Sequence, residues 1–185
     1  MPITTLDPKT ALIVVDLQAG IVTLPLAHPV TGIVDRSAEL LRVFRDRGLP
    51  VVLVNVAGAP SGRTDQGRPG TRSFPEGWTD LIPELDRQPE DILVTKHARS
   101  AFTGTGLVDR LRALDVTQVV VTGIATGSGV ESTARDAHEQ GFHVTLPVDA
   151  MTDRDLSTHE HSVANVFPRI AEVGSTQDVL DVLAK

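Results

Sequence analysis

The sequence predicts one α/β domain over residues 1–185: a three-layer fold in which a six-stranded parallel sheet lies between two layers of helices. Three observations predict it. Short β-branched runs recur along the chain, helical patterns separate them, and each run is apolar throughout. Continuous apolar runs are expected where helices cover both faces of a parallel sheet. The doubly wound, Rossmann-like architecture follows.

The candidate strands share β-branched composition and a length of four to six residues. They cover residues 11–16, 51–56, 92–95, 119–122, 143–147 and 170–173.

Two helices are predicted in the first two thirds of the chain. The first carries apolar and small residues at helical spacing and has Gly48 where a C-cap is expected. Its inward positions are Ile33, Ser37, Leu40, Leu41 and Phe44. The second begins with Thr105 as N-cap and buries Leu107, Leu111 and Leu114.

Three more helices are predicted in the last third. Val130, Ala134 and Ala137 form a narrow apolar stripe, and Glu131 and Arg135 make an i,i+4 pair before Gly141 ends that helix. The next covers residues 155–167 and stops at Pro168. Ser175 and Asp178 open the last helix, and its apolar positions are Val179, Leu180, Val182 and Leu183.

Residues 57–78 form the one long irregular segment, rich in Gly and Pro. It follows the second strand, on the carboxyl edge where α/β proteins bind ligands. Arg72, Phe74 and Trp78 are its candidates for covering a pocket.

Composition narrows the function classes. The residues are 41% hydrophobic and the formal net charge is −7, which argues against nucleic acid or an anionic membrane as partner and favours a small molecule. There is no cysteine, so no disulfide, thiolate nucleophile or zinc–thiolate site is available. No signal-like or membrane-length apolar run is present, and a cytoplasmic protein is expected.

Polar groups stand at three strand ends that meet on one edge of a parallel sheet. Asp16 ends the first strand, Lys96 follows the third, and the loop GIATGSG follows the fourth. A carboxylate, an ammonium group and backbone N–H groups then face one cleft. Each has a structural alternative: Asp16 as a turn residue, Lys96 in solvent, and Gly127 and Gly129 serving only backbone conformation. The combination is more specific than its parts.

Four motifs in this order, VVDLQ, TKHARSAFTGTGL, GIATGSGVESTARDAHEQGF and VDAMTDRD, resemble the isochorismatase-like hydrolase superfamily over residues 12–183. That superfamily includes nicotinamidases, N-carbamoylsarcosine amidohydrolases and isochorismatases. The resemblance implies that Asp16 is the catalytic aspartate, Lys96 its partner lysine, and Ile124–Ala125 a non-proline cis peptide. It also implies a cofactor-free enzyme and a homo-oligomer.

The chain departs from the amide-cleaving members at Gly129, where they carry a nucleophilic cysteine. Ser128 is adjacent but points about 100° away along a helix start, and a serine without a strong base is a poor nucleophile. Isochorismatases also have glycine here, and the resemblance suggests that they cleave a vinyl ether by protonation from the aspartic acid and attack by water. In that scheme burial must raise the pKa of Asp16 against the lowering effect of Lys96.

Two alternatives remain open. Water activated by Asp16 as a base can attack a small amide, with the Ala125 and Gly129 amides as oxyanion hole. A non-catalytic binding protein is the other, although retention of both Asp16 and Lys96 argues against it. Further candidates for substrate contact are Gln18, Arg72, Phe74, Trp78 and Ser128.

No metal or cofactor is expected. The stretch after the second strand contains no histidine, whereas metal-using relatives carry an Asp and His cluster there. His159 and His161 lie two apart on a predicted helix, which suits exposure to solvent better than joint ligation. His97 is at most a wall residue.

Overall fold

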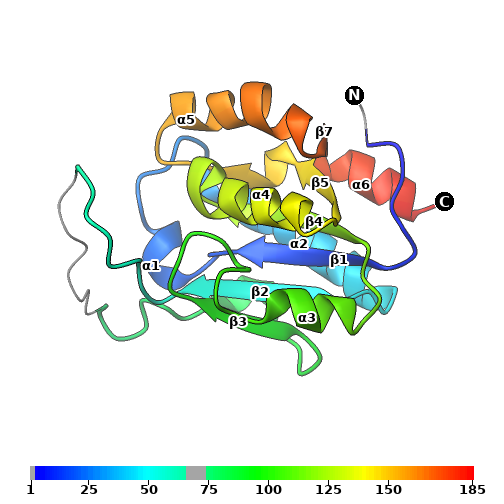
Figure 1. The fold of residues 1–185 in the computed structure, drawn as a ribbon, viewed down its shortest axis with the longest axis horizontal. Helices are drawn as coiled ribbons and strands as arrows, with labels where there is room; N and C mark the ends of the chain where they lie inside the picture. Colours follow the sequence, from blue (N-terminus) through cyan, green and yellow to red (C-terminus); the bar gives the residue numbers. More distant parts are fainter. Residues whose placement is uncertain (1–2, 66–73) are drawn as a thin grey trace.

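The fold is a parallel α/β sheet, described by a computed structural model for residues 3–65 and 74–185 (Figure 1). The strand order is β3-β2-β1-β4-β5-β7, and every pairing is parallel. These strands are β1 (Thr10–Val15), β2 (Val51–Val56), β3 (Ile92–Lys96), β4 (Gln118–Ile124), β5 (His143–Pro147) and β7 (Glu172–Gly174). A two-residue strand, β6 (Met151–Thr152), pairs with the end of β4. The predicted six-stranded sheet is confirmed, with β6 as an addition.

The order of the strands reverses at β1 and β4. From β1 the chain adds β2 and β3 on one side, and β4 begins the other side. Loops diverge at such a point, so a crevice opens at the carboxyl ends of the two strands. Asp16 follows β1 there, and the Gly-rich turn that begins at Ala125 follows β4.

Helices cover both faces of the sheet. They are α1 (Ala19–Val22), α2 (Val30–Asp46), α3 (Leu107–Arg112), α4 (Glu131–Glu139), α5 (Leu156–His161) and α6 (Thr176–Leu183). Side chains alternate along β1: Ile13 and Val15 enter the core shared with α3 and α4, and Leu12 and Val14 enter the core shared with α2 and α6. Figure 1 shows α4 in front of the sheet and α2 behind it.

Three local predictions need correction. Gly106, with φ of 70°, is the N-cap residue of α3 rather than Thr105, although the Thr105 hydroxyl accepts from Leu107 N at 3.3 Å. Leu114 lies beyond the end of α3 and is 43% exposed. The helix predicted over 155–167 is regular only in α5; it continues as π-type and 3₁₀ turns over 162–169, with Pro168 inside the last turn.

The last strand begins two residues later than predicted, because Ala171 still belongs to the turn at Phe167, to whose carbonyl its N–H donates at 2.9 Å. The short helix α1 was not predicted. Within the described residues, no helix is long and apolar enough to cross a membrane.

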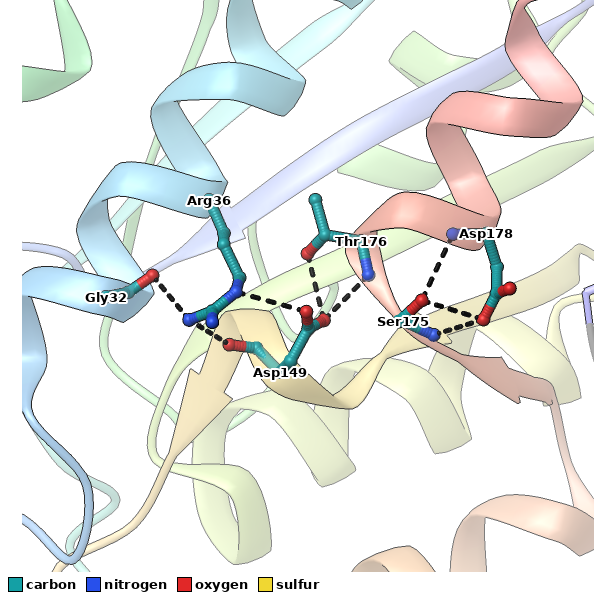
Figure 2. Close-up of polar contacts among 6 residues, drawn as sticks. All are labelled: Gly32, Arg36, Asp149, Ser175, Thr176 and Asp178. Carbon is teal, nitrogen blue, oxygen red and sulfur yellow. Dashed lines mark hydrogen bonds and ion pairs between the residues drawn. The ribbon is translucent and has the colours of Figure 1, made fainter.

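A polar cluster ties α2 to α6 on the face opposite α4 (Figure 2). Asp149, in the turn after β5, accepts hydrogen bonds from the backbone N and the hydroxyl of Thr176 at 2.7 and 2.9 Å. Its other oxygen pairs with Arg36 Nε at 3.1 Å. Ser175 and Asp178 form the predicted capping box at the start of α6. This cluster holds the two helices of one layer together.

Candidate active site

Asp16 is placed by a tight backbone arrangement at the end of β1. Its φ is 53°, in the left-handed region, and its N–H donates to the Val54 carbonyl at 2.9 Å. Gly123 of β4 lies beside Val15, and a Cβ there would collide with the Val15 carbonyl. Only glycine lets β4 approach β1 this closely. The close approach brings the loop after β4 next to the Asp16 carboxylate.

Lys96 reaches the same point from the last position of β3. Because β2 separates β1 from β3, the two strands are about 10 Å apart, and a long side chain is needed to span β2. The ammonium Nζ lies 2.8 Å from Asp16 Oδ2 and donates to the Ala98 carbonyl at 3.2 Å. Asp16 is 5% exposed and Lys96 2% exposed. The predicted meeting of carboxylate and amine is confirmed.

The surroundings of Asp16 favour the neutral form of its carboxyl more than water does. Burial raises the pKa of Asp16 and the neighbouring Lys96 lowers it by a smaller amount, so that the pKa is about 6. Oδ2 accepts from Lys96, whereas Oδ1 is buried and has no hydrogen-bond partner among the described residues. A buried carboxylate oxygen left unpaired costs free energy. Protonation of Asp16 relieves that cost.

A cavity of about 340 Å³ opens over the pair. Asp16, Lys96, Ala125, Ser128 and Gly129 form part of its lining. Apolar residues of α1 and the segment after it form another part, namely Ile21, Leu24 and Leu26. A larger cavity of about 670 Å³ lies at the opposite, amino ends of β2 and β3. Its buried carboxylate, Asp91, is paired with Arg45 at 2.7 Å, unlike the carboxyl of Asp16.

The turn after β4 presents its backbone to this cavity. The Ile124–Ala125 peptide bond is cis. Ser128 N and Val130 N both donate to the Ala125 carbonyl at 3.1 Å, and Gly127 N donates to Asp153 Oδ2 at 2.8 Å. Those three amides are therefore committed inside the protein. The two amides predicted to bind an oxyanion, Ala125 and Gly129, belong to residues that line the cavity.

Glycine at position 129 leaves room directly beside the carboxylate. A Cβ at this position would lie 3.2 Å from Asp16 Oδ2 and 3.0 Å from Val15 Cγ1. A side chain here would therefore stand next to Asp16. Ser128 lines the cavity, but within the described part of the chain its hydroxyl has no hydrogen-bond partner that could activate it.

Other predicted contact residues lie outside the cavity lining. The Gln18 amide continues the ladder of β2: it accepts from Val56 N at 2.7 Å and donates to the Val56 carbonyl at 3.1 Å. Trp78 stacks on Phe74 with ring centroids 4.2 Å apart and packs against Gly20. Arg72 lies outside the described residues. Gln18, Phe74 and Trp78 are not among the described residues that line the cavity.

Three arginines that sequence reasoning missed line the cavity: Arg63, Arg99 and Arg154. None of their guanidinium groups has a protein partner among the residues described. Among the described residues of the lining, Asp16 is the one that is acidic. All three follow carboxyl ends of strands, so the rule that located Asp16 and Lys96 could have located them too. The cavity is basic although the chain carries a net charge of −7.

The histidines require one correction. His159 is half-buried, and its Nδ1 lies 2.8 Å from the Thr126 hydroxyl, whereas the helical spacing predicted exposure to solvent. His161 and His97 are exposed. Over residues 3–65 and 74–185, no group of three or more His, Cys, Asp or Glu side chains is arranged to hold a metal ion.

Comparison with known proteins gives consistent matches. The isochorismatase domain family matches residues 10–178. An uncharacterized isochorismatase family protein, YecD of Escherichia coli O157:H7, is 38% identical over 183 residues, covering 94% of this chain and 96% of that protein. The maleamate amidohydrolase of Pseudomonas putida is 29% identical, over 95% of this chain and 87% of its own. The structure of an isochorismatase family protein from Burkholderia thailandensis superposes with a TM-score of 0.92 at 38% identity, covering 100% and 99% of the two chains.

Proposed function

Since this chain belongs to the isochorismatase family of hydrolases, we propose that it hydrolyses a small anionic molecule with Asp16 as a general acid and without a covalent intermediate. The observation that carries the proposal is the state of Asp16. Its carboxyl is buried, its pKa is raised to about 6, and Oδ1 has no partner. A carboxyl with these properties can hold a proton near neutral pH and donate it to a substrate.

Burial has a larger effect on the pKa of Asp16 than Lys96 has, so a part of the carboxyl groups is protonated near neutral pH. With a pKa of about 6, about one tenth of the Asp16 carboxyls are protonated at pH 7 and about half at pH 6. Because Oδ2 accepts from Lys96, the proton resides on Oδ1. Lys96 then orients the acid as well as lowering its pKa.

The preferred substrate chemistry is a vinyl ether, as in an isochorismate-like molecule. Asp16 transfers its proton to the terminal vinyl carbon, and the electrons of the double bond form the new C–H bond. The adjacent carbon becomes an oxocarbenium ion, to which water adds. The water loses a proton to the Asp16 carboxylate, and the resulting hemiketal separates into a ketone and an alcohol. Water is the only co-reactant, and no side chain has to attack.

Three features support this chemistry over nucleophilic catalysis. The chain has no cysteine. Gly129 stands where a side chain would contact Asp16 Oδ2. The Ser128 hydroxyl has no base to activate it within the described structure.

The charge of the cavity supports an anionic substrate. Arg63, Arg99 and Arg154 supply three guanidinium groups around a space of about 340 Å³. Arginine binds carboxylates through two parallel hydrogen bonds, and unpaired guanidinium groups are available for that purpose. We therefore propose a substrate that carries one or two carboxylates.

Amide hydrolysis is the second candidate, because the maleamate amidohydrolase of P. putida is a relative at 29% identity. In this mechanism ionised Asp16 removes a proton from water, the water attacks the amide carbon, and the Ala125 and Gly129 amides bind the oxyanion. The two mechanisms require opposite protonation states of Asp16. Their pH profiles are therefore opposite.

One experiment separates the candidates. The protein and its Asp16→Asn variant are incubated with isochorismate and with a panel of small amides that includes maleamate, from pH 5 to 8, while pyruvate and ammonia are measured. Pyruvate that depends on Asp16 and increases toward acid supports the proposal. Ammonia alone would overturn the vinyl-ether chemistry in favour of the amidase. No turnover of any substrate, with tight calorimetric binding of one of them, would favour a binding protein.

Two further properties belong to the proposal. We expect a cytoplasmic protein, as the sequence predicts, and a homo-oligomer, which rests on family resemblance alone. Light scattering coupled to size exclusion measures the assembly directly.

A further inference from the structure

Two imidazole rings contact the segment that forms the wall of the cavity at Ala125. His159 of α5 lies 2.8 Å from the Thr126 hydroxyl through Nδ1. His28, between α1 and α2, lies 2.9 Å from the Thr152 hydroxyl through Nδ1. The two rings meet edge to face, with centroids 4.8 Å apart. Neither ring lines the cavity.

The partners of these rings flank the Ile124–Ala125 peptide. Thr126 follows it in the chain, and Thr152 of β6 pairs with Ile124 in the parallel ladder. Both hydroxyl-bearing residues are fully buried. His159 therefore bonds directly to Thr126, whereas His28 bonds to the β6 residue that pairs with Ile124.

The helix that carries His159 packs tightly on the turn. A Cβ at Gly127 would collide with Thr158 Cγ2, so α5 and the turn are in direct contact. Asp153, which precedes α5, fixes Gly127 N through Oδ2, and its carbonyl accepts from Ala27 N at 2.8 Å. The turn is thus held by α5 and by the segment of His28 together.

We propose that His159 is a positioning residue: through Thr126 it holds the turn so that the Ala125 and Gly129 amides face the substrate beside Asp16. This inference rests on the proposed function for its effect on turnover. Its structural part, the dependence of the turn on His159, does not.

The charged and titratable groups around His159 are consistent with a neutral ring. Burial lowers the pKa of His159 the most, and the adjacent His28 lowers it further. Asp153 and Glu160 raise it by smaller amounts. Glu131 of α4 also faces this region, and it accepts from the Ser162 hydroxyl at 2.6 Å. At pH 7 His159 is therefore neutral, and acid charges it.

The test compares two replacements that differ in hydrogen bonding. His159→Phe keeps the ring and removes the contact with Thr126, whereas His159→Asn keeps a polar group near the position of Nδ1. We expect kcat to fall about 10- to 100-fold in His159→Phe, with KM changed less than twofold, because small displacements of positioning groups cost this much. His159→Asn should recover most of kcat. His161→Ala, exposed on the same helix, is the control and should behave as wild type.

A second measurement does not require any substrate. In ¹H–¹⁵N spectra, the amide resonances of Ala125 and Gly129 should move in His159→Phe and return toward wild type in His159→Asn. Unmoved amides, or equal kcat losses in the Phe and Asn variants, would overturn the positioning role. Shifted amides in a protein that turns over no substrate would instead refute the proposed function and leave the structural link standing.

Discussion

Two carboxylates, Asp149 after β5 and Asp16 after β1, have contrasting surroundings. Asp149 is partly open to solvent, with a side-chain exposure of 34%, and both of its oxygens are bonded to α2 and α6 (Figure 2). Asp16 has a side-chain exposure of 7%, one partner, and one oxygen without any. The first arrangement satisfies an ionised carboxylate. The second leaves the carboxylate poorly satisfied and makes proton uptake favourable.

The difference separates a structural carboxylate from a chemical one. Hydrogen bonds at Asp149 join two helices and contribute to folding stability. Burial of the Asp16–Lys96 pair costs desolvation that apolar residues of similar size would not incur. Such an arrangement is expected where catalysis needs it, since natural proteins keep unfavourable groups chiefly at functional sites.

Exchanging the Asp16 carboxyl for an amide gives the largest expected effect. Asp16→Asn should lower kcat/KM by about 10²- to 10⁴-fold, because an amide cannot donate the acidic proton. Asn still accepts a hydrogen bond from Lys96, so circular dichroism should show a folded protein. Asp149→Asn is the matched control and should keep kcat/KM within twofold. Equal activity losses at both positions would erase the contrast.

Removing both members of the buried pair tests the contrast in stability. The double variant Asp16→Leu with Lys96→Met should be as stable as wild type or more stable, because replacing a buried pair by apolar residues often gains stability. Urea unfolding should give it a free energy of unfolding that is equal to that of wild type or higher by about 1–4 kcal/mol. Asp149→Ala should instead lose about 1–3 kcal/mol, because it leaves the Thr176 amide and Arg36 without their acceptor. A double variant that is much less stable than wild type would show that the Asp16–Lys96 pair serves folding.

How far the sequence could predict this contrast depends on backbone geometry. Asp16 and Lys96 were predictable because every parallel strand delivers its carboxyl end to the same edge, whatever the side chains do. His159 was not, because helical spacing alone does not show which neighbouring layer covers a helix face. Leu114 was misplaced for a related reason: the apolar period continues past Arg112, whereas the helix ends there. The strand-end rule could have placed the arginines of the cavity at the same edge, but it could not orient their side chains, because these residues lie on irregular segments without periodicity.

The pH dependence sharpens the contrast because only Asp16 should control turnover near neutrality. With its pKa raised to about 6, kcat/KM for a vinyl ether should fall about tenfold per pH unit above pH 6, as the protonated acid disappears. Amide hydrolysis would show the reverse limb, rising up to about pH 6. A profile flat from pH 5.5 to 8 contradicts both.

The same group affects stability with a defined sign. Because the pKa of Asp16 is higher in the folded state than its ordinary value of 3.8, folding favours the protonated form. Its contribution is fully present below about pH 3.8 and is lost as the pH rises through about 6. As the pH is lowered from 7 to 4, the free energy of unfolding of wild type should therefore rise relative to that of Asp16→Asn. Urea unfolding at each pH measures this difference.

The smallest expected effect is at Ser128, which lines the cavity next to Gly129. Ser128→Ala should change kcat/KM by less than about twofold, because a hydroxyl without an adjacent base is not an activated nucleophile. Mass spectrometry of the acid-quenched enzyme during turnover should find the mass of the free protein and no acyl adduct. A fall of tenfold or more, or an adduct that disappears in Ser128→Ala, would mean that the site holds a nucleophile after all. Asp16 would then act on that hydroxyl instead of on the substrate.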